Sequence, residues 1–522
     1  MPDLKKAHCI SRLKSRTLVC PSVRNNMIWA LISVAISYGI SFFVTPYVTN
    51  NIGVDAYGYV SLSNTFIAYI DIIAIGLNSF AGRFIADAYF KGDLENAEKY
   101  YSSTLMGDLL LSVVVSIPCL FAVSKLDVWL NVPASLCKDV KILFILVLFR
   151  YFLTIIRTAF AAGAFIKNRL DLTEKITGSG YIVQAGILLL LCMTPKAKVW
   201  YVGVASFSAA AWLLICNYIA KKRLTPDLIC TRRRASFHTL REIMKPGIWT
   251  SVNELGNVLN SGLDLILTEA MLSPEVLGQV AIAKQFSTAC SIMIGKISSS
   301  YRPQLLMHYT GDDVESVKHT MIRSMKFCSF CCMMIISIFT ACGKQFLQLW
   351  IPGQDLDFIY AASVIAILSD VLPGIVNPLY YSYTMAKKVT VPCFVTLSMG
   401  AANLISMVIL LKTTSLGGYA VLLTTLVINM VHFIDAPLYS AYCLKLKWHT
   451  FYPNVIRCLT ACGIGFMVSF LLRGVFSSSC SWLFLILKGI ITTCAVAGAG
   501  YLVLYRDTGN PFSILRILRQ RK

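Results

Sequence analysis

Amide and carboxylate side chains recur at helical spacing inside otherwise apolar stretches of this sequence. Asn253, Asn257, Asn260 and Asp264 follow one another at intervals of four, three and four residues, which places them on one face of an α-helix. Polar groups in hydrocarbon are costly and usually face a partner or a water-filled cavity. Hydrogen bonds between neighbouring helices would also account for such a face. The acid that completes this one favours a cavity.

Charged residues in three further apolar stretches are candidates to lie near the polar face of residues 253–264. Asp264 and Lys284 lie about ten residues either side of a turn, so we expect them at similar depth on adjacent helices. A static ion pair and a proton-exchange pair both fit this spacing. Arg150 and Arg157 share one face of another stretch, and Asp71 lies on a polar stripe of a third. We expect Asp264, with Asp71 as the alternative, to be the ion-coupling residue.

Motifs for enzymatic chemistry are missing from the sequence. It has no HExxH, no cluster among its six histidines and no GxxxxGK[ST] phosphate loop, so we expect no catalytic residues, no metal, no cofactor and no ATP hydrolysis. Cys328 and Cys331 have redox spacing but lie inside an apolar run, where buried inert thiols are expected.

The composition predicts a membrane protein. The 522 residues are 56% hydrophobic and 14% charged, whereas soluble domains carry about 25% charged residues. The net charge of +21 comes from short basic clusters between apolar runs, which is the pattern of cytoplasmic loops rather than of a nucleic-acid surface. We therefore expect a bilayer as partner and no nucleic acid.

The apolar runs predict an all-α polytopic fold of about 14 transmembrane helices. Alternation of basic loops places both termini in the cytoplasm and Cys137 and Cys480 outside. The predicted spans are 27–49, 59–80, 102–124, 139–164, 177–194, 200–220, 246–270, 278–300, 324–343, 358–384, 389–411, 417–440, 455–475 and 482–504.

The chain repeats itself at an offset of 220 residues. This shift aligns Ile28-Trp29 with Ile248-Trp249, and the turn motif Gly58-x-Val60 with Gly278-x-Val280. Six spans separate the copies, so both enter the membrane from the same side, and a parallel pseudo-twofold is expected. The predicted organisation is a basic N-terminal segment at 1–26, six-helix bundles at 27–220 and 246–440 joined by a basic linker at 221–245, and two extra helices with a basic tail at 441–522.

The opening stretch NNMIWALISVAISYGISFFVTPYVTNNIGVDAYGYVSLSNTFIAYI resembles polysaccharide repeat-unit flippases of the Wzx type. So do the loop sequence GVDAYGY and the later KGDLENAEKYY. The wider superfamily includes multidrug extruders and lipid II flippases. The resemblance implies an alternating-access transporter of the bacterial inner membrane that carries an undecaprenyl-pyrophosphate-linked oligosaccharide to the outer leaflet. Coupling to protons or sodium and contact with a polysaccharide polymerase are implied as well.

An anionic pyrophosphate would require cationic donors in the cavity. Arg150, Arg157 and Lys284 are the candidates, with Arg83 and Arg302 at a cytoplasmic entrance and Asn257 and Asn260 as further substrate-binding residues. Two other functions remain open. A multidrug or cation extruder would favour acids over bases in its cavity, and a membrane-embedded glycosyltransferase or polymerase would need a long loop bearing acids or histidines.

Overall fold

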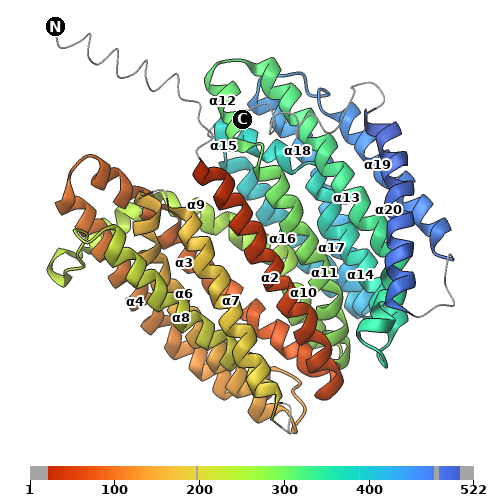
Figure 1. The fold of residues 1–522 in the computed structure, drawn as a ribbon, viewed down its shortest axis with the longest axis horizontal. Coiled ribbons are helices and arrows are strands. Elements are labelled where there is room, and N and C mark those ends of the chain that lie inside the picture. Colours follow the sequence, from red (N-terminus) through yellow and green to blue (C-terminus); the bar gives the residue numbers. More distant parts are fainter. Residues whose placement is uncertain (1–20, 168, 195–197, 387, 475–480, 506–522) are drawn as a thin grey trace.

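The computed structural model describes residues 21–167, 169–194, 198–386, 388–474 and 481–505, and within them the chain folds into a bundle of long helices (Figure 1). The first half of the sequence forms α2 (Pro21–Asn51), α3 (Val54–Phe90), α4 (Leu94–Ser124), α5 (Leu126–Trp129), α6 (Cys137–Ile166), α7 (Leu170–Cys192) and α8 (Trp200–Leu224). A 3₁₀ turn, η1 (Arg232–Arg234), follows in the basic linker.

The second half has more breaks in its helices. It comprises α9 (Phe237–Ser261), α10 (Leu263–Met271), α11 (Pro274–Ser299), α12 (Arg302–Thr310), α13 (Val314–Trp350), α14 (Leu356–Val371), η2 (Leu372–Ile375), η3 (Asn377–Tyr380), α15 (Tyr381–Met385), α16 (Thr390–Thr413), α17 (Gly418–Met430) and α18 (His432–Cys443). Helices α19 (Tyr452–Leu472) and α20 (Trp482–Tyr505) follow. Pro373 and Pro378 lie in η2 and η3, where a missing amide hydrogen and a fixed φ interrupt the α-helix.

Each predicted span coincides with one helix or with a broken helix, such as α9 and α10 for 246–270. Ten of the described segments are long and apolar enough to cross a membrane. The chain is therefore a multi-pass membrane protein, and the all-helical class is confirmed. The count of about 14 spans stays a prediction.

The offset of 220 residues reappears in the helix boundaries. Helix α3 begins at Val54 and α11 at Pro274, α4 at Leu94 and α13 at Val314, and α7 at Leu170 and α16 at Thr390. The same cap starts α4 and α13, because the Asp93 carboxylate accepts from the Asn96 amide at 3.0 Å and the Asp313 carboxylate from the Ser316 amide at 2.9 Å. These hydrogen bonds stabilise the charged carboxylates and lower the pKa of both caps.

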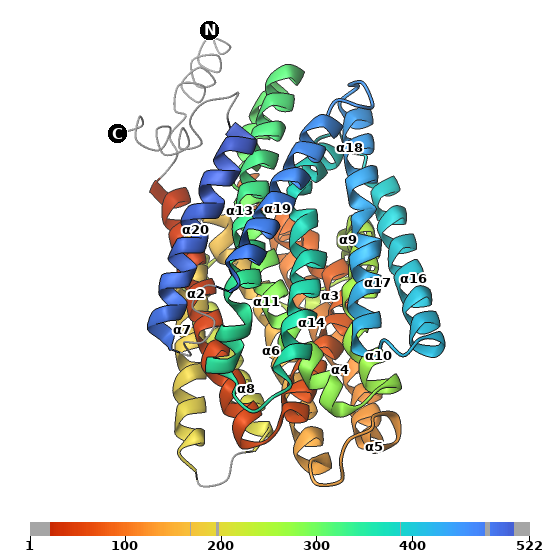
Figure 2. The same ribbon diagram turned by 90° about the vertical axis from the view of Figure 1, so that its right-hand side faces the viewer.

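Two ends of the bundle are distinguished by their connections. The turn end carries the short turns at 52–53 and 272–273, and the basic end carries the linker between α8 and α9. The ribbons of the two halves meet at the turn end and diverge toward the basic end (Figure 1). Helices α19 and α20 pack on α13 and on each other (Figure 2), and the ring of Trp482 at the start of α20 lies 6.5 Å from that of Phe42 on α2.

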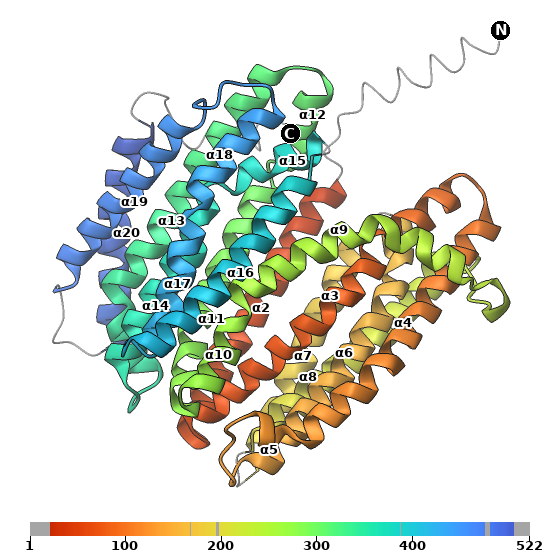
Figure 3. The same cartoon turned by 180° about the vertical axis from the view of Figure 1, so that it is seen from behind.

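Helix α9 crosses from one half to the other (Figure 3). Its first turns pack against α3 and α4, and its last turns pack against α16. The crossing depends on glycines at both contacts. A Cβ atom on Gly247 would lie 1.9 Å from the carbonyl oxygen of Gly76, and one on Gly256 would lie 2.9 Å from the backbone of Leu397. Helix α2, the counterpart of α9 in the first half, packs mainly on α7.

Candidate functional site

A polar cavity of about 180 Å³ lies in the first half, between α2, α3, α6, α7 and α8. Arg150 of α6 lines it together with Ser37, Ser41 and Gln184. The guanidinium of Arg150 donates to the side-chain oxygen of Asn64 at 2.9 Å. An amide is a neutral partner, and no carboxylate of the described residues forms an ion pair with Arg150, so its positive charge is available to an anion.

The other predicted arginines lie apart from this cavity. Arg157 is half-buried two turns further along α6, within electrostatic reach of Glu174 on α7. Arg83 is exposed near the basic end of α3, with its guanidinium 5.4 Å from the Phe80 ring centroid. Arg302 begins α12 and is exposed, 6.0 Å from the Tyr381 ring. Both positions are compatible with the expected entrance, which stays a prediction.

Asp264 and Lys284 form the ion pair that their spacing predicts. Asp264 is fully buried on α10, and its other oxygen accepts from the hydroxyl of Thr425 on α17 at 3.5 Å. The Lys284 side chain on α11 is 14% exposed. Lys284 is therefore engaged inside the second half rather than lining the cavity around Arg150.

The predicted polar face of residues 253–264 does not line a single cavity. Asn257 is exposed and donates to Glu254 at 3.3 Å. Asn260, by contrast, donates to the side chain of Asn429 at 2.7 Å inside the second half. The two asparagines therefore have different neighbours in this structure, and their shared role in one site stays a prediction. The cause of the different neighbours is the oblique course of α9, because the same helix face meets different neighbours along its length.

Further polar side chains complete the network around Asp264. Asn403 on α16 donates to the Asn260 carbonyl at 2.5 Å and to Thr425 at 3.2 Å. Asp370 on α14 accepts from Ser287 at 2.6 Å. Asn403, Thr425 and Asp370 are not among the residues predicted for the site. Each is an isolated polar residue in an apolar span, and this was the only available signal.

Gln285 joins the two halves beside the first cavity. Its side-chain oxygen accepts from the Thr45 hydroxyl at 3.0 Å and from the Tyr57 hydroxyl at 2.7 Å, and both donors line the cavity. Gln285 is also the neighbour of Lys284 in α11. The cavity around Arg150 is therefore closed on this side by a residue adjacent to the buried ion pair.

Two other contacts hold the halves together at the turn end. The Trp350 indole donates to the Phe42 carbonyl at 2.7 Å. The Asn131 backbone amide donates to the carboxylate of Glu269, and the Asn131 side chain donates to the Glu269 carbonyl at 3.1 Å.

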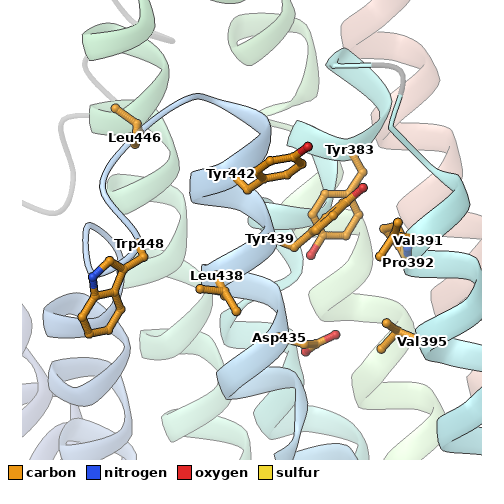
Figure 4. Close-up of a pocket in the computed structure, with 10 residues that line it drawn as sticks. All are labelled: Tyr383, Val391, Pro392, Val395, Asp435, Leu438, Tyr439, Tyr442, Leu446 and Trp448. Atoms are coloured by element: carbon orange, nitrogen blue, oxygen red, sulfur yellow. The ribbon is translucent and has the colours of Figure 1, made fainter.

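A larger groove of about 560 Å³ lies between α16 and α18, in the second half (Figure 4). Its walls are mostly aromatic and aliphatic, with Tyr383, Tyr439 and Tyr442 around it and Asp435 below them in the view. None of the predicted site residues lines this groove. Within the described part of the chain, no group of three or more His, Cys, Asp and Glu side chains could hold a metal ion.

The arrangement of helices is that of a known class of transporter. A MATE-family multidrug resistance transporter of the MOP superfamily, solved in an inward-facing conformation, matches with a TM-score of 0.64 at 15% identity, over 84% of this chain and 98% of that one. The lipid II flippase MurJ in an inward closed conformation matches with a TM-score of 0.64 at 15% identity, over 91% of this chain and 99% of that one. The chain has the fold of MOP-superfamily transporters.

The particular family follows from the sequence comparison. A family model described as polysaccharide biosynthesis protein matches residues 23–307, and the chain belongs to this family. It is 26% identical over 479 residues to the uncharacterized membrane protein EpsK of Bacillus subtilis (strain 168), covering 90% of this chain and 94% of that protein. The resemblance to polysaccharide flippases of this superfamily is thereby confirmed.

Proposed function

We propose that this protein flips an undecaprenyl-pyrophosphate-linked oligosaccharide repeat unit from the cytoplasmic to the outer leaflet of the bacterial inner membrane. The observation that carries the proposal is Arg150, a guanidinium without a carboxylate partner among the described residues, in a polar cavity closed against the second half. Guanidinium groups bind phosphate oxygens through two parallel hydrogen bonds. Membership of the polysaccharide biosynthesis family supports a glycan as the other part of the substrate.

The transport cycle alternates access to this cavity. Both termini and the basic linker lie in the cytoplasm, so the basic end faces the cytoplasmic leaflet. In the state described here, contacts of Gln285 and Trp350 close the turn end. The pyrophosphate enters past Arg83 and Arg302, binds Arg150 and Arg157, and is released outside after the turn-end contacts break. Asn257 and Asn260 contribute on the side of α9.

The pair of Asp264 and Lys284 couples this cycle to an ion gradient. Movement of the Lys284 ammonium toward substrate phosphate leaves the Asp264 carboxylate without its partner and favours proton uptake. Asp71 is the alternative carrier, and sodium the alternative ion. Removal of the glycan outside by a polysaccharide polymerase adds a second driving force. No catalytic step by the chain itself is required.

Reconstitution of the purified chain tests this function. Vesicles would carry a fluorescent polyprenyl-pyrophosphate oligosaccharide, and a membrane-impermeant quencher would report the fraction in the outer leaflet. We expect the chain to accelerate exchange between leaflets, and the Arg150→Ala variant to lose most of this activity. Acceleration of ethidium transport with no effect on the glycan lipid would instead identify a cation extruder and refute the proposal.

A further inference from the structure

A second buried carboxylate, Asp108, lies halfway along α4 in the first half. It is fully buried, and one of its oxygens accepts from the Asn78 side chain of α3 at 2.9 Å. Its other oxygen, Oδ2, has no hydrogen-bond partner among the described residues. Asp108 is not among the residues predicted for the site, because it is a single acid in a long apolar span.

Among the described residues, no cation forms an ion pair with Asp108, and apolar side chains follow it along α4. Leu111, Val115 and Tyr151 belong to a cluster of buried and half-buried side chains from α3, α4 and α6. Along α4, the nearest ion pairs are those of Lys99 with Glu95 and of Glu98 with Arg234. Lys99 and Glu98 lie nine and ten residues closer to the basic end, or about 14–15 Å along the axis. Asp108 is therefore not the partner of a buried base, unlike Asp264.

Titratable groups on the neighbouring helices do not form an ion pair with Asp108 in the described part of the chain. Tyr151 of α6 is buried and lies within electrostatic reach of both Asp71 and Asp108. On α9, Glu242 accepts from Tyr100 nearer the basic end at 3.1 Å. His238, Arg241 and Lys245 on α9 are exposed, and a buried ionised carboxylate without a cationic partner would be strongly destabilised.

Helix α9 covers this position from the second half of the sequence. A Cβ atom on Gly107, the neighbour of Asp108, would lie 2.7 Å from Cδ1 of Leu240 on α9 and 3.2 Å from Cδ2 of Leu77 on α3. Leu240 thus packs over the site where α3 and α4 meet. Because α9 also packs on α16, a rotation of one half against the other would move Leu240 relative to Gly107 and to the site of Asp108.

We infer that Asp108 is a proton-binding site of the first half, neutral while α9 covers it and open to proton exchange when α9 moves away. The proton resides on the carboxyl group, and the Asn78 amide orients that group by donating to its other oxygen. The link to α9 movement rests on the alternating access of the proposed function, whereas the bound proton itself does not.

Infrared spectroscopy of the full chain in phospholipid vesicles tests the bound proton without any glycan substrate. We expect a protonated-carboxyl band at a pH at which exposed carboxylates are ionised, and its loss in Asp108→Asn. Asp127→Asn, at an exposed acid of the turn end, is the matched control and should keep the band. Persistence of the band in Asp108→Asn, or its loss in Asp71→Asn instead, would overturn the assignment.

The fold of the variant is itself informative. An amide closely mimics a neutral carboxyl group, so Asp108→Asn should be as abundant as the unmodified chain. Loss of abundance in this variant would show that the charged form is needed, and would overturn the inference too.

Hydrogen–deuterium exchange of the carboxyl proton, followed by the shift of the same band, tests whether α9 shields Asp108 from water. Leu240→Ala should accelerate the exchange several-fold, and Phe237→Ala, at a 78% exposed position of the same helix, should not. Equal rates in both variants would refute the role of α9 while leaving the flippase proposal untouched.

Discussion

Gly58 and Gly278 lie directly against each other where α3 meets α11. A Cβ atom on Gly58 would lie 2.8 Å from the backbone nitrogen of Gly278, and one on Gly278 would lie 2.0 Å from the Val54 carbonyl oxygen. The two glycines are also equivalent under the offset of 220 residues. Contact between equivalent residues is what a twofold axis between α3 and α11 requires, and it is made at the turn end.

Enlarging Gly58 should therefore open the turn end. In Gly58→Leu the side chain would displace α11, and overpacking of this kind costs about 1–3 kcal/mol. We expect the population to shift roughly 5- to 150-fold away from the state closed at this end. Spin labels at Asp55→Cys and Glu275→Cys, also equivalent positions, would report the distance between the halves. Gly82→Leu, in open space on the same helix, should leave that distance unchanged, and an unchanged distance in Gly58→Leu would contradict the prediction.

Removal of the Gln285 side chain should act in the same direction but more weakly. Gln285→Ala deletes the acceptor of two hydrogen bonds between the halves, each contributing about 0.5–1.5 kcal/mol. The same spin-label distance should broaden toward longer values, and Tyr57→Phe should show about half of the effect. Gln304→Ala, at an exposed residue of α12, serves as the control. An effect of the control as large as that of Gln285→Ala would exclude a role of the Gln285 hydrogen bonds in holding the two halves together.

Arg150 should contribute more to transport than Arg157. Charge-assisted hydrogen bonds contribute about 1.5–3 kcal/mol each, so Arg150→Ala should lower the flipping rate roughly 10- to 150-fold at equal membrane abundance. Arg150→Lys should recover only part of the flipping rate, because lysine keeps the charge but cannot donate two parallel hydrogen bonds as a guanidinium does. Arg157→Ala should reduce the rate less, since Arg157 lies outside the cavity lining. Normal flipping rates in both alanine variants would show that neither arginine binds the anionic substrate, and would contradict the assignment of an anion site to this cavity.

The buried ion pair should affect stability before it affects transport. In Asp264→Asn the Lys284 ammonium loses its partner, and breaking a buried pair costs about 3–5 kcal/mol, so abundance in the membrane should fall. The double variant with Lys284→Met should recover abundance. We expect it to lack the dependence of transport on external pH. Recovery of full, pH-dependent transport in the double variant would eliminate Asp264 as the proton carrier.

Cysteine labelling should establish the orientation. Cys137 begins α6 at the turn end, and Cys230 lies in the linker at the basic end. In a background lacking the other cysteines, a membrane-impermeant maleimide added to intact cells should label Cys137 and spare Cys230. Cys480, also expected outside, lies beyond the described residues. The reverse labelling pattern would invert the topology.

Much of the fold follows from the sequence, because membrane helices are determined by local composition. The apolar runs predict where the helices lie, and the repeated turn motif predicts two related halves. The equal spacing of Asp264 and Lys284 from one turn predicts their ion pair. Each of these inferences depends on neighbours along the chain or on a single helix hairpin. Such local relationships do not depend on how segments distant in sequence pack together.

Only the tertiary structure decided which neighbour each helix face meets. Asn257 and Asn260 share a face but have different surroundings, since Asn257 is exposed and Asn260 donates to Asn429 inside the second half. Gln285 and Asp108 carry no sequence signal beyond being polar in an apolar span, yet one joins the two halves and the other lacks a partner for one of its oxygens. Helical periodicity specifies the face of the helix on which a side chain lies. Packing between segments distant in sequence specifies which side chains that face contacts.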